Sequence, residues 1–232
     1  MNIAVIPARG GSKRIPRKNI KLFNNKPIIS FAIEAAEKSE LFDRIIVSTN
    51  DNEIKKISEI YGAEVPFMRP EKLANDYTDT HSVILHAIEM FNKLNYEFNN
   101  ICTIYPCVPL IQINDIKKVF ELLKINLDNY CFPVTEFESP IERALTLDKK
   151  SKIKPIENIN QSIRTQDFNK IYHDCGMFYW ASKETWLLKK EIAKNGVGYP
   201  IPSWRSIDID NNDDWMKAEI LFHGLKNKCF IS

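Results

Sequence analysis

The chain has 232 residues, of which 44% are hydrophobic and 27% are charged. A chain of this length buries enough apolar surface to fold without disulfide or metal staples, and we expect one domain over residues 1–232. The formal net charge is only +2, which excludes a nucleic-acid binder that works by bulk positive charge. No eighteen apolar residues run together, so we expect no membrane partner.

The five cysteines include no Cys-x-x-Cys pair, and several stand among apolar residues. We therefore expect buried free thiols, the state that a reducing compartment maintains. The first apolar run, residues 3–6, is too short for the core of a signal peptide. A cytoplasmic location is the expectation from both observations.

Strand and helix patterns alternate along the chain. Continuous apolar runs predict strands at 3–6, 44–48, 64–67, 101–105 and 130–134. Apolar positions with a helical period predict helices that contain residues 28–36, 54–61, 83–94 and 116–123. Asp51 is expected to cap the second helix, with Gly62 just past its end, and Thr78, Asp79 or Thr80 is expected to cap the third.

The alternation predicts an α/β fold of three layers, a mainly parallel sheet with helices on both faces. Ligands of such sheets bind beyond the carboxyl ends of the strands. The pattern weakens over residues 135–171, where we expect a hairpin-like excursion that serves as a lid or partner surface. Strands at 176–180 and 205–209 and a helix at 213–222 are predicted after it.

A basic loop, residues 9–18, follows the first predicted strand directly. It holds five cationic side chains and the adjacent Gly10 and Gly11. Glycines permit left-handed backbone that brings N–H groups close to a ligand, while arginine and lysine bind phosphate oxygens. The spacing excludes a dinucleotide fingerprint, which needs a third glycine, and a Walker loop. The loop is interpreted as another kind of anion site, with a solvated basic turn as the alternative.

Two carboxylates near the end of the chain form a second candidate site. If the segment 208–210 is a strand, a period of two places Asp208 and Asp210 on one face, with Ile209 on the other. A divalent cation such as Mg²⁺ would relieve their repulsion, although Asp210 or Asn211 could instead cap the following helix.

A cationic loop and a carboxylate pair together suit a nucleoside triphosphate. Neither site holds an obvious nucleophile. Direct attack on phosphorus by a bound acceptor is therefore the expected chemistry, with the protein supplying position and charge.

Four motifs in the same order along the chain resemble the CMP-sugar-acid synthetases, a family of cytidylyltransferases. They are residues 6–13 with Pro16, Lys18 and Asn19; residues 69–74 with Asp76; residues 83–88; and residues 208–210. In the first motif, Arg14 stands where the family usually has a glycine. The resemblance implies a Rossmann-like nucleotidyltransferase fold.

Within that family, the middle of the chain resembles the branch that makes CMP-pseudaminic acid for surface or flagellar glycosylation. The stretches concerned are 102–110, 132–145 and 164–180. Sialic acid enzymes commonly have Asn-Gly where this chain has Cys175-Gly176. Cys107 and Cys175 also depart from the small residues expected in the pseudaminic branch.

The resemblance implies that the anomeric hydroxyl of a nine-carbon sugar acid attacks the α-phosphorus of CTP, releasing pyrophosphate. Arg9 and Lys18 would act on the triphosphate, and Asp208 and Asp210 would hold Mg²⁺ as cofactor. The implied nucleotide contacts are Ala8, Arg9, Gly10, Gly11, Ser12, Lys18, Asn19 and Arg69.

Sugar contacts are expected from Tyr105, Arg143, Arg164, Gln166, Tyr172 and His173. The two arginines suit a planar carboxylate, and surface ion pairs are their alternative. The alternatives in function are the same reaction on legionaminic, N-acetylneuraminic or Kdo acid, or a non-catalytic nucleotide-binding protein. A homodimer is expected, in which the excursion at 135–171 reaches the neighbouring subunit's site.

Overall fold

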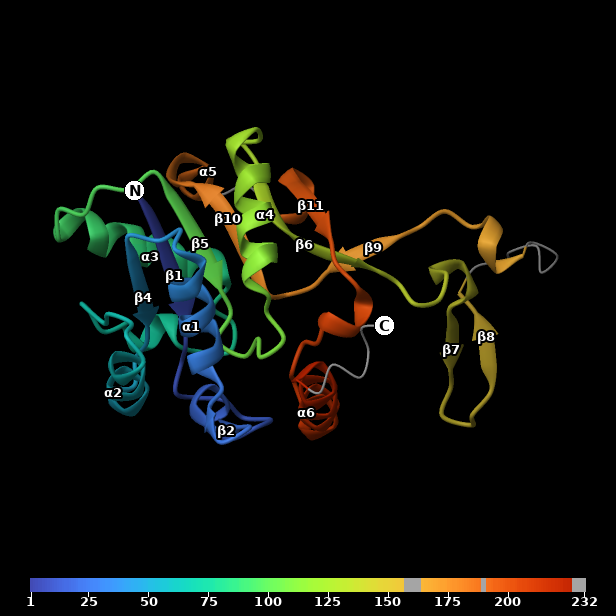
Figure 1. The fold of residues 1–232 in the computed structure, drawn as a ribbon. Coiled ribbons are helices and arrows are strands. Elements are labelled where there is room, and N and C mark those ends of the chain that lie inside the picture. The colour runs from blue at the N-terminus through green and yellow to red at the C-terminus, as the bar shows by residue number, and fades with distance from the viewer. Residues whose placement is uncertain (157–163, 189–190, 227–232) are drawn as a thin grey trace.

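The computed structural model describes residues 1–156, 164–188 and 191–226 (Figure 1). Its centre is a seven-stranded sheet in the order β11-β6-β10-β5-β1-β4, with β9 paired to β6 beyond this path. These strands are β1 (Asn2–Pro7), β4 (Arg44–Ser48), β5 (Asn100–Ile104), β6 (Tyr130–Glu136), β9 (Tyr172–Asp174), β10 (Phe178–Ser182) and β11 (Gly196–Pro200). Strand β1 pairs in parallel with β4 and β5, and β11 with β6, whereas β10 and β9 run antiparallel to their neighbours. The predicted mainly parallel α/β sheet is confirmed.

Helices cover both faces of this sheet (Figure 1). They are α1 (Ile29–Ser39), α2 (Asn52–Ile60), α3 (Thr80–Lys93), α4 (Ile113–Lys124) and α5 (Lys183–Leu187). A sixth helix, α6 (Asn212–Lys226), packs against Phe23 and the start of α1 instead. Alternate residues of β1 enter the two cores: Ala4 and Ile6 pack with α1 and α4, while Ile3 and Val5 pack with α3. All four side chains are fully buried, as a strand inside a three-layer fold requires.

The residues predicted to cap the helices do so in the structure. The Asp51 carboxylate accepts hydrogen bonds from the backbone N–H groups of Glu53 and Ile54 and so caps α2. Gly62 follows α2 with a φ of 94°, the left-handed conformation that glycine adopts without strain. Of the three candidate caps of α3, Asp79 accepts the bond, from the Ser82 N–H.

Two predicted strands are wrong. Within residues 64–67, only Glu64 forms an isolated bridge, to Ile46 of β4, and Met68 forms another to Thr49, just after β4. Residues 205–209 contain no strand: Arg205 ends a 3₁₀ turn, Ser203–Arg205, and 206–209 lie outside every strand. The sheet instead contains β11, a strand that the sequence analysis did not predict, because Gly196 and Gly198 interrupt its hydrophobic alternation. Those glycines are required: a Cβ on Gly196 would lie 2.5 Å from Phe132 Cε1, and one on Gly198 would lie 2.9 Å from Val134 Cγ2.

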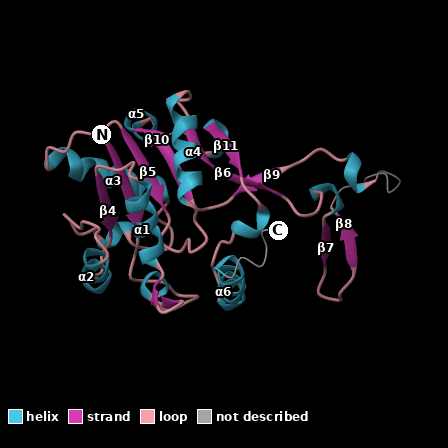
Figure 2. Cartoon of the chain, viewed as in Figure 1, coloured by secondary structure: helices cyan, strands magenta, loops and turns pink. Residues whose placement is uncertain are grey.

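Between β6 and β9, residues 137–156 and 164–171 form an arm that projects from the body (Figure 2). It contains the hairpin β7 (Leu145–Leu147) and β8 (Ile153–Pro155) and two 3₁₀ turns, Ile141–Arg143 and Thr165–Asp167. The predicted hairpin-like excursion is confirmed at these residues; 157–163 lie outside the described part. Large apolar side chains are exposed on the arm: Phe137, Ile141, Leu145, Leu147, Ile153 and Ile156.

Short elements complete the part that positions the site. A 3₁₀ turn, Lys18–Ile20, leads to a small hairpin of β2 (Leu22–Phe23) and β3 (Lys26–Pro27). Further 3₁₀ turns are Glu71–Leu73 and Ala193–Asn195.

Cys102, Cys107, Cys131 and Cys175 are free thiols, as expected, and Cys229 lies outside the described residues. In the described ranges, none of the helices has the length and apolar character needed to cross a bilayer.

Candidate active site

A small hydrophobic core joins the basic loop to the acidic segment. Ile15 from the loop and Ile209 from the segment are both buried, against Phe23, Trp215 and Ala218 among others. Asp208 and Asp210 flank the buried Ile209, so both carboxylates face outward although the backbone is not a strand. Apolar packing therefore brings together two charged segments that are nearly 200 positions apart in the chain.

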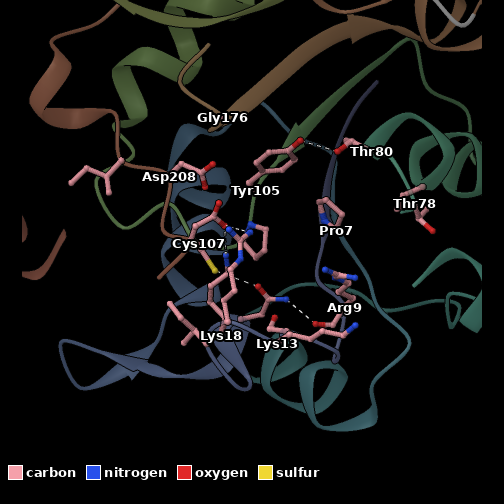
Figure 3. A pocket seen from close by; sticks show the side chains of 18 of the residues that line it. Pro7, Arg9, Lys13, Lys18, Thr78, Thr80, Tyr105, Cys107, Gly176 and Asp208 are labelled. Carbon is pink, nitrogen blue, oxygen red and sulfur yellow. Dashed lines mark hydrogen bonds and ion pairs between the residues drawn. The ribbon is translucent and has the colours of Figure 1, made fainter. Parts of the chain in front are cut away.

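The two segments line one pocket beyond the carboxyl ends of β1 and β5 (Figure 3). We call it the basic pocket. Its wall is formed by Pro7, Arg9, Ser12, Lys13, Arg14, Ile15, Lys18, Asn19, Arg69, Thr78, Thr80, Val83, Tyr105, Pro106, Cys107, Gly176, Ile207, Asp208 and Asp210. Its position is the one that the predicted topology requires of a ligand site.

Most of the predicted nucleotide and metal residues meet in this pocket. Arg9, Ser12, Lys18, Asn19, Arg69, Asp208 and Asp210 all line it. Ala8, Gly10 and Gly11 are not among the lining residues: Ala8 is fully buried, and the Gly10 N–H donates to Asn50 Oδ1 at 3.1 Å. Lys13 and Arg14 also line the pocket, although neither was predicted as a ligand contact. Their positive charge within the basic loop was the signal that could have identified them.

The glycines of the loop do not have the expected left-handed backbone. Positive φ occurs at Arg17 (55°) and not at Gly10 or Gly11. Gly10 is instead required by a close approach, because a Cβ there would lie 2.6 Å from Asp51 Oδ2. Arg17 turns toward α2, where its guanidinium binds Asp51 at 2.5 and 2.9 Å and Glu53 at 2.6 Å. Arg17 therefore anchors the loop to the start of α2 and is not part of the pocket wall.

Replacing Asp51 by asparagine should remove this anchor while keeping the cap, since asparagine caps helices as well as aspartate does. Arg17 is the main cause that holds the pKa of Asp51 down at about 2. The stabilisation is thus complete above the unfolded pKa near 4 and is lost as the pH falls toward about 2. We expect Asp51→Asn to lower the free energy of unfolding by about 1 kcal/mol at pH 7, after allowance for solvent screening.

Urea unfolding of both proteins at pH 7 and near pH 2 measures this effect. The difference between them should shrink toward zero at the lower pH. An equal difference at both pH values would show that the ion pair with Arg17 contributes nothing.

Asn19 fixes the other side of the loop. Its side chain is 5% exposed, and its Nδ2 donates to the Arg9 carbonyl oxygen at 2.9 Å. The Cys107 thiol donates to Asn19 Oδ1 at 3.3 Å, and burial raises the pKa of that thiol to about 12, so it stays protonated. Asn19 thus holds the backbone at Arg9 and links it to the end of β5, in addition to lining the pocket.

Arg69 lines the pocket and carries two buried hydrogen-bond donors without partners among the described residues. The residue is 5% exposed, and its Nε and Nη2 atoms have no hydrogen-bond partner among the described residues. Burial and, to a lesser extent, the nearby Arg9 lower the pKa of Arg69 to about 10. A buried guanidinium without partners costs free energy, and acceptor atoms of a ligand would remove that cost.

The side chains of Asp208 and Asp210 do not cap α6. Helix capping by Asp210 or Asn211 was the alternative to a metal site, and Asn211 is the one of the two that caps. Asn211 Oδ1 accepts from the N–H groups of Asp213 and Asp214, and Asp214 Oδ2 accepts in return from Asp210 and Asn211. Asn211 and Asp214 therefore cap α6, and the side chains of Asp208 and Asp210 are left to the pocket.

Cations already surround Asp210. Its Oδ1 lies 2.8 Å from Arg14 Nη2 and 3.7 Å from Lys18 Nζ, which also donates to the Ile209 carbonyl at 2.6 Å. Desolvation by the pocket wall and then the charge of Asp210 raise the pKa of Asp208. Two neighbouring carboxylates, one of which raises the pKa of the other, are a donor set that fits a hard divalent cation such as Mg²⁺.

A buried ion pair holds the acidic segment in place. Arg205 Nη1 binds Asp115 Oδ2, and the two side chains are 15% and 5% exposed. Asp115 belongs to the first turn of α4, so the pair fixes the start of the segment that carries Asp208 and Asp210 against the body of the sheet.

Tyr105 is the one predicted sugar contact that lines the pocket. Its hydroxyl lies 2.8 Å from Thr80 Oγ1. Its ring stands edge-on to Tyr179, whose hydroxyl donates to Asp174 at 2.7 Å. Asp174 also accepts from the Gly176 N–H, which fixes the turn that forms one wall of the pocket.

The other predicted sugar contacts lie away from this chain's pocket. Arg164 pairs with Asp167 at 3.0 Å and Arg143 lies over the Phe168 ring, both on the arm, where the 3₁₀ turn also carries Gln166. His173 on β9 packs against Phe137, and Tyr172 lines a separate groove at the base of the arm. Their role in sugar binding stays a prediction.

Fold and site together define the class: an α/β protein with an anion-binding pocket at the carboxyl ends of its parallel strands, built from cations and a carboxylate pair. The profile of the cytidylyltransferase family matches residues 3–194. The chain belongs to this family.

Individual relatives agree with that assignment. The chain is 38% identical over 222 residues to pseudaminic acid cytidylyltransferase of Campylobacter jejuni, covering 95% of this chain and 96% of that protein. It is 30% identical over 227 residues to CMP-N,N'-diacetyllegionaminic acid synthase of Legionella pneumophila, covering 94% and 95%.

Among solved structures, CMP:2-keto-3-deoxy-manno-octonic acid synthetase complexed with CTP superposes with a TM-score of 0.71 at 15% identity. That comparison covers 97% of this chain and 99% of the other. At this identity, it shows that the two share a fold.

Proposed function

We propose that this protein transfers CMP from CTP to the anomeric hydroxyl of pseudaminic acid, giving CMP-pseudaminic acid and pyrophosphate. The observation that carries the chemistry is the meeting of cations and carboxylates in one pocket: Arg9, Lys18 and Arg69 lie there with Asp208 and Asp210. Two donors of Arg69 have no hydrogen-bond partner among the described residues. The sugar is assigned from the 38% identity with the Campylobacter jejuni enzyme, against 30% with the legionaminic relative. Free thiols support a reducing compartment, which we take to be the cytoplasm.

In this reaction, the cations of the pocket bind the triphosphate. Arg9 and Lys18 stabilise the negative charge that grows on the departing pyrophosphate. The Arg69 donors, which are buried and already oriented, bind acceptor atoms of the nucleotide without a further ordering cost.

Asp208 and Asp210 would hold Mg²⁺ or another divalent cation. Such a cation, when bound, neutralises phosphate charge and lowers the pKa of a coordinated hydroxyl. The two carboxylates orient it, while the Asp115–Arg205 pair keeps their segment in position.

A homodimer is part of this proposal. The arm exposes a set of apolar side chains, and Arg143 and Arg164 lie on it, outside the pocket of their own chain. A second copy could cover the apolar surface, and the two guanidinium groups would then lie near the carboxylate of a sugar in the neighbouring site.

Pyrophosphate release tests the reaction. The chain is incubated with CTP, Mg²⁺ and, separately, pseudaminic, legionaminic, N-acetylneuraminic and Kdo acid. We expect release with CTP that is fastest with pseudaminic acid. No release with any acid would contradict the enzymatic function, and a preference for another acid would contradict only the choice of sugar.

A further inference from the structure

Two cations of the basic pocket share one carboxylate. Asp76 Oδ1 lies 2.7 Å from Arg9 Nη1, and Asp76 Oδ2 lies 2.6 Å from Lys13 Nζ. Both distances are those of charge-assisted bonds to a carboxylate or a phosphate. Arg9 and Lys13 lie side by side at one end of the pocket (Figure 3).

The bridging carboxylate comes from a different segment of the chain than the two cations. Asp76 belongs to the connection between the 3₁₀ turn Glu71–Leu73 and α3, and Thr78 and Thr80 after it line the pocket wall. Asn75 shapes this connection, because its Oδ1 accepts from the Tyr77 N–H at 2.8 Å and the Thr78 hydroxyl at 3.1 Å. The connection is therefore a formed turn that brings Asp76 to the two cations.

The pair is exposed enough to open. The side chains of Arg9 and Asp76 are 33% and 36% exposed, and that of Lys13 is 81% exposed. Lys13 and, second, Arg9 lower the pKa of Asp76, so the carboxylate is ionised at neutral pH. Ion pairs this exposed are weak, and a phosphate group with more than one charge competes with them effectively.

We propose that Asp76 is an internal substitute for phosphate: it occupies Arg9 and Lys13 while the pocket is empty, and the polyphosphate of the substrate displaces it. The idea rests on the proposed function for the identity of the ligand. Its consequence is that Asp76 lowers the affinity of the site for every ligand that uses these two cations. The apparent dissociation constant of such a ligand equals its intrinsic dissociation constant divided by the fraction of molecules in which the two cations are free.

The opposite role is also physically reasonable. Asp76 could instead hold Arg9 and Lys13 in the geometry that phosphate needs, in which case removing its charge would weaken binding. The two roles predict changes of opposite sign, so a single measurement separates them.

Inorganic pyrophosphate is the probe, with cytidine as a ligand that carries no phosphate. Isothermal titration calorimetry would compare the wild-type chain with Asp76→Asn, which keeps size and removes charge. We expect pyrophosphate to bind the variant at least about threefold more tightly, with cytidine unchanged. The matched control is Glu121→Gln, which removes one charge from an exposed pair with Lys124 on α4, outside the pocket wall, and should change neither ligand.

Unchanged or weaker pyrophosphate binding by Asp76→Asn would overturn the proposal, and so would equal tightening by Glu121→Gln. Detectable binding by the variant alone would support it. The assay of CMP transfer is separate: wild-type activity combined with unaltered pyrophosphate binding in Asp76→Asn would remove the role of Asp76 and leave the proposed function standing.

Discussion

Replacing Asp210 by asparagine is expected to lower the rate of CMP transfer at least about a hundredfold. The amide keeps the size of the side chain and loses the charge that would hold a divalent cation beside Asp208. It also weakens the attraction to Lys18, whose Nζ lies 3.7 Å from Asp210 Oδ1. Steady-state pyrophosphate release measures the rate, and thermal unfolding should show that the fold is retained, since the backbone bonds that cap α6 do not use this side chain.

The matched control is Asp213→Asn. Asp213 lies in the first turn of α6, three positions further on, and is not part of the pocket wall. Its replacement should leave the rate within about twofold of wild type, since an exposed charge outside the site contributes little. Full activity of Asp210→Asn would refute the metal-binding role of this carboxylate.

Replacing Arg69 by methionine should weaken CTP binding by about a hundredfold without destabilising the empty protein. Two charge-assisted hydrogen bonds of roughly 1.5 kcal/mol each account for a factor of that size. In the empty protein, Nε and Nη2 of Arg69 have no partner among the described residues, so an apolar side chain of similar length removes a buried charge. Calorimetric titration with CTP and thermal unfolding of the ligand-free chain measure the two effects.

Arg44→Met serves as the control for this change. Arg44 binds Glu64 at 2.5 Å and lies over the Tyr96 ring, away from the pocket wall. The control should lower the melting temperature slightly and leave the affinity for CTP unchanged. A large loss of stability in Arg69→Met, with CTP binding intact, would show that Arg69 is a structural residue.

The sequence predicted the elements whose signals are local. The strands predicted at 3–6, 44–48, 101–105 and 130–134 are buried over most or all of their length. A strand that is buried on both faces consists of consecutive apolar residues, so an apolar run in the sequence identifies it directly. The caps Asp51 and Asp79 act within three residues of themselves. Strand β11 escaped prediction because Gly196 and Gly198 are there to avoid Phe132 and Val134, which is a constraint from another strand.

In the candidate site, too, local features were predictable from the sequence, whereas contacts between distant residues were not. Loop charge and motif resemblance identified Arg9, Lys18, Asp208 and Asp210 as pocket residues, and all four line it. The interpretation of the loop glycines was wrong, because the need for Gly10 comes from the approach of Asp51, 41 positions away. Nothing in the sequence shows that Nε and Nη2 of Arg69 lack a hydrogen-bond partner among the described residues, since that depends on which buried groups surround them.

By itself, the sequence determined the α/β class, the family and the two charged segments, because burial patterns, capping and motifs are properties of neighbouring residues. Only the tertiary structure decided how those charges are paired: Arg17 with Asp51, Arg14 with Asp210, and Arg9 and Lys13 with Asp76. Charge attraction depends on distance in space, and that distance follows from the packing of Ile15 and Ile209 in one small core.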